Sequence, residues 1–75
     1  MRVIEDLADK LAADTVAAMD ELNEPRLFEE IAKSLGSSSQ TTEEAFLTAI
    51  RVRLAERRAR ALLEEKLALA RNAGS

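Results

Sequence analysis

The chain has 75 residues, of which 33% are charged and 47% hydrophobic, and its formal net charge is −3. It contains no cysteine and no histidine, which excludes disulfides, thiolate metal ligands and the commonest neutral general base. A chain of this length buries only about 60% of the surface that its unfolded form exposes. Because disulfides and a metal site are excluded, we expect oligomerisation to supply the missing stability.

The composition indicates an all-α protein made of one domain. Alanine and leucine dominate the apolar residues, and the only aromatic residues are Phe28 and Phe46. No apolar run approaches the roughly 18 residues of a membrane span, and the first residues lack the apolar core of a secretory signal. We therefore expect a soluble, cytoplasmic protein, of a bacterial kind, that does not contact a membrane.

The first predicted element is an amphipathic helix over residues 3–22. Its apolar residues recur at intervals of three and four and form one stripe on the helix surface. The stripe consists of Ile4, Leu7, Ala8, Leu11, Thr15, Ala18, Met19 and Leu22. Residues 1–24 carry two basic and seven acidic side chains, a net charge of −5, so this helix is also the acidic part of the chain.

A proline and a glycine delimit a short second helix over residues 25–35. Pro25 disfavours helix at the residue before it and is preorganised for the first position of a new helix. Gly36 stands where a left-handed C-terminal cap is expected. A polar loop, residues 36–41, follows.

The third predicted helix runs over residues 42–71 and is unusually long. Thr41 and Glu44 have the spacing of a capping box, and no helix-breaking residue follows until Gly74. About 30 helical residues extend over about 45 Å, whereas a compact chain of this length has a diameter near 30 Å. We expect this helix to extend past the rest of the domain by about ten residues.

The apolar face of the long helix changes direction along its length. Large apolar residues of its first half share one side, while those of its second half lie about 150° away, so the helix has two partners. Two short helices laid along one long helix would form a flat layer with an open outer side. The expected architecture is therefore all-α, with two shorter helices packed along the long C-terminal helix in a dimeric helical bundle.

The leading functional hypothesis is a small, non-enzymatic protein–protein interaction module or adaptor. It would form a homodimer through the long helix and present helical surface to an unidentified partner protein, such as the target of an inhibitor encoded beside it. The predicted interface residues are Ala55, Ala59, Leu62, Leu63, Leu67 and Leu69. Neither the carboxylate pairs nor the serines have a base beside them, so we expect no catalytic residue, cofactor, metal or small-molecule ligand.

An alternative is a small DNA-binding regulator. The spacing of Ile31-Ala32, Leu35-Gly36, Phe46 and Ala49 resembles the helix-turn-helix of sigma-factor and response-regulator families. This resemblance implies nucleic-acid contacts by Thr41, Thr42, Thr48, Arg51 and Arg53. Three features depart from the pattern of those families: Ser37 replaces an apolar residue, Thr42 replaces valine, and Glu43 with Glu44 would approach phosphates.

Five arginines lie close together on the long helix, and three interpretations of them remain open. They are Arg51, Arg53, Arg57, Arg58 and Arg60. They could neutralise phosphates, or they could pair with the acidic first helix within the chain or across a dimer. They could also be solvated, with Glu56 and Arg60 forming a pair one helical turn apart.

Overall fold

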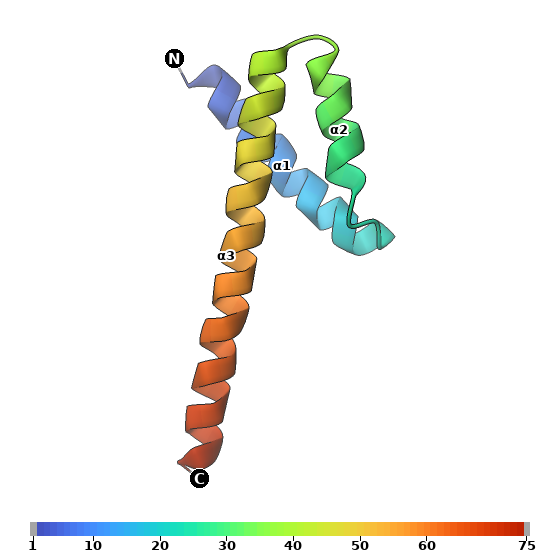
Figure 1. The fold of residues 1–75 in the computed structure, drawn as a ribbon. Helices are drawn as coiled ribbons and strands as arrows, with labels where there is room; N and C mark the ends of the chain where they lie inside the picture. Colours follow the sequence, from blue (N-terminus) through green and yellow to red (C-terminus); the bar gives the residue numbers. More distant parts are fainter. Residues whose placement is uncertain (1, 75) are drawn as a thin grey trace.

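The computed structural model describes residues 2–74 and contains three helices (Figure 1). Helix α1 spans Val3–Leu22, α2 spans Leu27–Gly36 and α3 spans Gln40–Ala73. No strand occurs among the described residues. The prediction of an all-α protein is confirmed, and the 34 residues of α3 make it the longest element.

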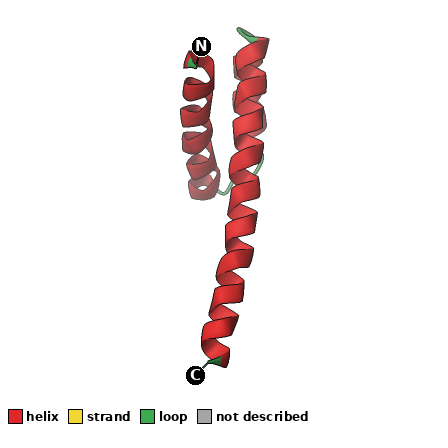
Figure 2. Ribbon diagram, turned by 90° about the vertical axis from the view of Figure 1, so that its left-hand side faces the viewer, coloured by secondary structure: helices red, strands yellow, loops and turns green. Residues whose placement is uncertain are grey.

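The three helices form a small head from which α3 protrudes. Helix α2 runs back alongside the first half of α3, while α1 crosses obliquely behind α3 (Figure 1). In the perpendicular view α1 forms a layer of its own beside α3 (Figure 2). Each helix contacts both of the others, so the expected flat layer is wrong: α1 covers the open side of the α2 and α3 pair.

The core of the head combines small residues of α1 and α2 with two large residues of α3. Phe46 and Ile50 are the largest fully buried side chains. The other buried apolar residues are Ala8, Ala12, Val16, Met19 and Ala32. The alanines allow α1 and α2 to approach α3 closely, so the two large side chains of α3 fill most of the space between the helices.

Part of the apolar stripe predicted for α1 lies outside this core. Ile4, Leu7 and Leu22 are exposed, Leu7 to 63%, whereas the neighbouring Ala12 and Val16 are buried. The sequence pattern predicts that the leucine side of α1 faces the core, but in the structure the helix is rotated about its axis so that its alanine side does. The alanine side faces inward because Phe46 and Ile50 occupy the volume that inward-facing leucines would need.

The turn between α1 and α2 differs from the one that Pro25 predicts. Asn23 adopts the left-handed conformation (φ 55°) and donates its backbone N–H to the carbonyl of Asp20, and the next N–H bonds to the carbonyl of Met19. These bonds cap α1. Pro25 lies in the turn rather than in a helix, and α2 begins two residues later, at Leu27.

The predicted cap at Gly36 and the predicted capping box at Thr41 are both wrong. No glycine among residues 2–74 has a positive φ, and Gly36 is the last residue of α2. A Cβ at Gly36 would lie 2.7 Å from the carboxylate at the end of the flexible Glu43 side chain, which can turn aside. Helix α3 begins at Gln40 because Ser39, which is extended, accepts the backbone N–H of Thr42 at 3.1 Å.

The protruding part of α3 determines the shape of the molecule. The radius of gyration is 16.0 Å, whereas a compact chain of this length has one of about 11 Å. Every described residue from position 55 onward is exposed, but Ala61 still lines a cavity with Met19 and Phe28, so the protrusion comprises residues 62–73, close to the ten residues expected. Among residues 2–74 no helix combines the length and the apolar character that crossing a membrane requires.

Candidate protein interface

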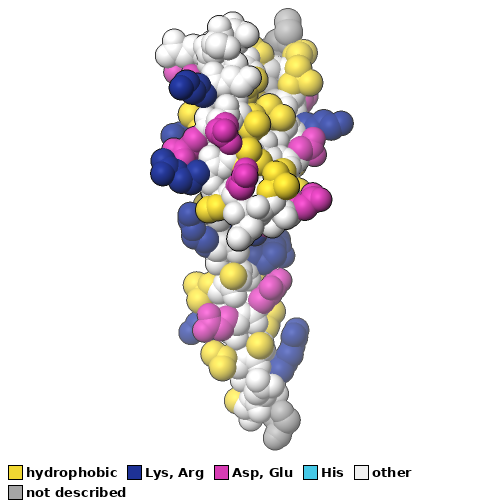
Figure 3. Space-filling model, turned by 90° about the vertical axis from the view of Figure 1, so that its right-hand side faces the viewer, with side chains coloured by type: hydrophobic (Ala, Val, Ile, Leu, Met, Phe, Trp, Pro, Cys, Tyr) yellow, Lys and Arg dark blue, Asp and Glu magenta, His cyan; other side chains and the backbone are white. Residues whose placement is uncertain are grey.

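The protruding segment of α3, residues 62–73, follows Ala61, which still lines a cavity with Met19 and Phe28 of the head, and it carries four leucines. Leu62, Leu63 and Leu69 are each more than half exposed, and Leu67 is 42% exposed. Figure 3 shows this part of the molecule as a single rod on which apolar and charged side chains alternate. An isolated helix gains little stability in water without a packed apolar face, so this segment is a candidate for contact with another chain.

The core-facing side of α3 does not continue as an apolar face into the protrusion. With 100° per residue, Phe46, Ile50 and Leu54 lie within about 80° of one another. On the protruding segment the same side carries Glu64 and Ala68, neither of which is a large apolar residue. The head could not bury this segment by extending α1 or α2 along α3.

A stripe on the opposite side of α3 has the alternating spacing of four and three residues that is typical of coiled coils. It lies about 150° from the core-facing side. We call it the heptad stripe; its members are Thr48, Val52, Ala55, Ala59, Leu62, Lys66, Leu69 and Ala73. All eight are exposed.

The heptad stripe includes four of the six predicted interface residues. Ala55, Ala59, Leu62 and Leu69 belong to it. Leu63 flanks it, and Leu67 lies about 110° from its centre, so the structure does not bring all six to one line. The prediction missed Val52, which is 62% exposed, although the regular spacing of the stripe identifies it.

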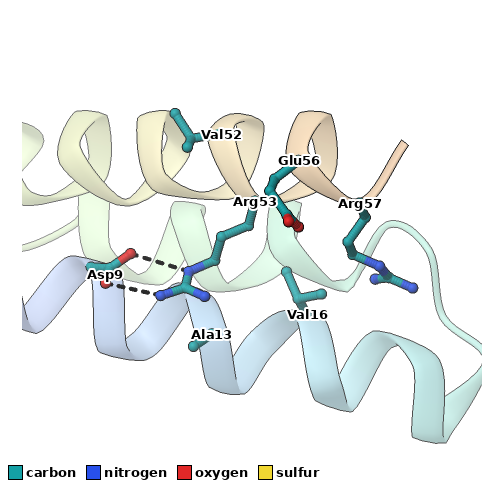
Figure 4. Close-up of a pocket in the computed structure, with 7 residues that line it drawn as sticks. All are labelled: Asp9, Ala13, Val16, Val52, Arg53, Glu56 and Arg57. Carbon is teal, nitrogen blue, oxygen red and sulfur yellow. Dashed lines mark hydrogen bonds and ion pairs between the residues drawn. The ribbon is translucent and has the colours of Figure 1, made fainter. Parts of the chain in front are cut away.

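Ion pairs within the chain engage three of the five clustered arginines. Arg53 donates two hydrogen bonds to Asp9 of α1, Nε to Oδ1 at 3.1 Å and Nη2 to Oδ2 at 2.9 Å (Figure 4). Arg57 pairs with Asp20 at the other end of α1 at 3.1 Å. These contacts bear out the interpretation that the arginines pair with the acidic first helix.

The third engaged arginine forms a pair along α3. Arg60 bonds to Glu56 one helical turn away, at 2.7 Å from Nε, and this carboxylate raises the pKa of Arg60. Within residues 2–74, neither Arg51 nor Arg58 has a hydrogen-bond or ion-pair partner. The same holds for Glu65 on the protruding segment.

A shallow groove of about 370 Å³ separates α1 from α3 beside these pairs (Figure 4). The Arg53 side chain reaches across it to Asp9, above a floor that includes Ala13 and Val16. Among residues 2–74, no group of three acidic side chains is placed to hold a metal ion. The groove is open to solvent, and the ion pairs of Arg53 and Arg57 with α1 lie along it.

The proposed nucleic-acid residues do not share one surface. Arg53 is engaged with Asp9, and the Thr42 hydroxyl is hydrogen-bonded to Ser39 at 2.8 Å. Thr41, Thr48 and Arg51 lie on the outer side of α3 and are exposed.

A second exposed apolar surface lies on α1. Its members are Val3, Ile4 and Leu7 at the start of α1 and Leu22 at its other end, and we call them together the α1 patch. The sequence pattern identified three of these residues but assigned them to the core. The molecule thus has two separate apolar surfaces, one on the head and one on the protruding helix.

Comparison of the chain with protein-family models, with curated protein sequences and with solved structures gives no match.

Proposed function

We propose that this chain is a small, non-enzymatic protein–protein interaction module that forms a homodimer through α3 and offers helical surface to a second protein. The observation that carries the proposal is the protruding segment, residues 62–73, which bears four exposed leucines, of which Leu62 and Leu69 lie on the heptad stripe. Burial of one leucine side chain is worth about 1.5–3 kcal/mol. Pairing of this segment with a second copy therefore has a large driving force.

The small core of the head supports the same proposal. Only Phe46 and Ile50 are large and fully buried, while nine large apolar side chains are exposed among the described residues. A chain that leaves more large apolar side chains outside than inside gains stability by association.

The α1 patch is the surface that we assign to the partner protein. It lies on α1, whereas the heptad stripe lies on α3, so a dimer formed through α3 uses a different helix. Glu5 and Asp6 lie in the first turn of α1 beside its apolar residues, which favours a partner helix with apolar residues on one face and basic residues at its borders.

The mass of the full chain in solution tests self-association. We expect sedimentation equilibrium and light scattering to give twice the chain mass of 8.2 kDa, with dissociation on dilution. The variant that combines Leu62→Glu with Leu69→Glu should be monomeric because it places four charges in the dimer interface. A wild-type chain that stays at 8.2 kDa over the whole accessible concentration range contradicts the proposal.

A matched control separates the two apolar surfaces. Leu7 of the α1 patch is 63% exposed, comparable to Leu69 at 58%, so that Leu7→Glu is the same chemical change at a similar exposure. We expect this variant to keep the dimer mass. If Leu7→Glu instead abolishes the dimer while the Leu62 and Leu69 variant keeps it, self-association uses the head and the assignment of the surfaces is wrong.

A further inference from the structure

The charged residues along one edge of the heptad stripe restrict the orientation and register in which two copies of α3 can pair. Arg51, Arg58, Glu65 and Asn72 each immediately precede a stripe residue and follow one another at intervals of seven. Such flanking positions face the partner helix in coiled coils and set its orientation. Within residues 2–74, Arg58 and Glu65 have no ion-pair partner, unlike Arg53, Arg57 and Arg60.

We infer that two copies of α3 pair antiparallel, in the register that places Arg58 of each copy against the partner's Glu65. This inference rests on the self-association proposed above and specifies its geometry. In an antiparallel pair, the edge that carries Arg58 and Glu65 on one helix lies against the same edge of the other helix. The two-fold axis then produces two equivalent contacts, each between Arg58 of one copy and Glu65 of the other. Arg58 and Glu65, which have no ion-pair partner among residues 2–74, acquire one in the pair.

The apolar layers of this register are complementary in size. Ala59 faces the partner's Leu62, and Val52 faces the partner's Leu69, so that each stripe leucine lies against a smaller side chain. Lys66 faces the partner's Ala55, beside which its methylene groups can pack while the ammonium reaches water. The register therefore fills the interface without opposing two large side chains in its central layer.

The neighbouring registers are disfavoured by like charges. A shift of one heptad in one direction places Glu65 against the partner's Glu65 at the two-fold axis, and a shift in the other places Arg58 against the partner's Arg58. A parallel, in-register pair would instead stack Lys66 on the partner's Lys66 in the middle of the stripe. We compare four arrangements: the proposed register, the two registers shifted by one heptad, and the parallel pair. Of these, the proposed register brings opposite charges into contact and places no like charges opposite each other.

The head does not obstruct this pairing. The core-facing side of α3, where α1 and α2 pack, lies about 150° from the heptad stripe. The stripe residues Thr48 and Val52 are both exposed, and Val52 also lines the groove between α3 and α1. The partner's protruding segment can therefore extend along the back of the head.

A distance measurement tests the orientation. The chain has no cysteine, so Ala73→Cys introduces a single spin-label site near the end of α3. In the proposed register the two copies of residue 73 lie about 38 Å apart along the axis, since each residue adds about 1.5 Å. We expect pulsed electron paramagnetic resonance to give about 40 Å; a parallel dimer would give about 10 Å and would overturn the inference.

Charge exchange tests the register. Arg58→Glu and Glu65→Arg should each weaken the dimer about 5-fold to 30-fold, because each opposes two pairs of like charges. The double variant should restore the wild-type dissociation constant. Arg51→Glu is the matched control, since in this register Arg51 faces the partner's Asn72, and we expect less than a 3-fold change from it.

The outcomes separate the inference from the proposal on which it rests. A monomeric wild-type chain removes both. A dimer that the Leu62 and Leu69 variant abolishes, but in which the double charge variant is no tighter than either single variant, retains the interaction module and overturns the register.

Discussion

The two guanidinium N–H groups of Arg53 meet the two carboxylate oxygens of Asp9, forty-four positions away along the chain. This bidentate contact joins the middle of α3 to the first half of α1 and lies at the edge of the groove between them (Figure 4). The contact forms because the rotation of α1 that buries its alanines also places Asp9 beside this edge of α3.

The Arg53 and Asp9 pair should contribute little to stability. Its side chains are 37% and 59% exposed, so we expect a coupling free energy of about 0.2–1 kcal/mol, decreasing as salt is added. A double-mutant cycle of Arg53→Gln and Asp9→Asn, followed by urea unfolding, measures it. Arg51→Gln is the control, with no expected coupling to Asp9. A coupling above 2 kcal/mol would contradict the view that solvent screens this pair.

Phe46 should be the residue on which the head depends most. It is completely buried among all three helices, so Phe46→Ala should cost about 3–5 kcal/mol, enough to unfold much of a small domain. Circular dichroism with urea measures the loss. Ile50→Val, a smaller truncation in the same core, should cost about 0.5–1.5 kcal/mol. Equal effects of the two variants would show that the core is not packed as described.

The close approach of α1 to its neighbours should make its buried alanines intolerant of larger side chains. Ala12 is fully buried, so we expect Ala12→Leu to destabilise the chain by about 1–3 kcal/mol through overpacking, despite the added apolar surface. Ala17→Leu, on the exposed side of the same helix, is the control and should be within about 0.5 kcal/mol of the wild type. Thermal unfolding distinguishes the two; a stabilising Ala12→Leu would mean that α1 packs more loosely.

The start of α3 should depend on Ser39 and not on Thr41. Because the Ser39 hydroxyl accepts the backbone N–H of Thr42, Ser39→Ala should cost about 1 kcal/mol. Thr41→Ala should be nearly neutral, as this residue is exposed and lies inside the helix. Urea unfolding of both variants makes the comparison. The reverse order of effects would restore the capping box that the sequence pattern indicated.

Glu29 should titrate below the normal range of a glutamate. Its hydrogen bond to Arg26 favours the charged form and lowers its pKa. A carboxylate with a lowered pKa in the folded state stabilises that state above the pKa of the unfolded chain, and this contribution is lost as the pH falls through the folded value. Carbon-detected NMR titration should show the Glu29 pKa rising toward normal in Arg26→Gln, and an unchanged value would rule out the pair.

Sequence periodicity was sufficient to define the helices but not their orientation. The stripe over residues 3–22 marks α1 because amphipathic spacing is a local property. Which side of that stripe faces inward depends on Phe46 and Ile50, which lie far away in sequence. The N-terminal cap of α3 is a second example. Ser37, Ser38 and Ser39 are equally good cap residues by sequence, and the loop geometry places only Ser39 where its hydroxyl accepts the backbone N–H of Thr42.

The sequence by itself determined that the chain is helical, that α3 outruns the rest of the molecule and that its apolar residues change sides, since composition, spacing and the absence of breakers act locally. Only the tertiary structure decided that α1 packs through its alanines and leaves Leu7 and Leu22 in solvent. It also decided which arginines pair with α1 and so left Arg58 without a partner among the described residues. These outcomes depend on the relative placement of helices, which is set by how distant side chains fill a shared volume.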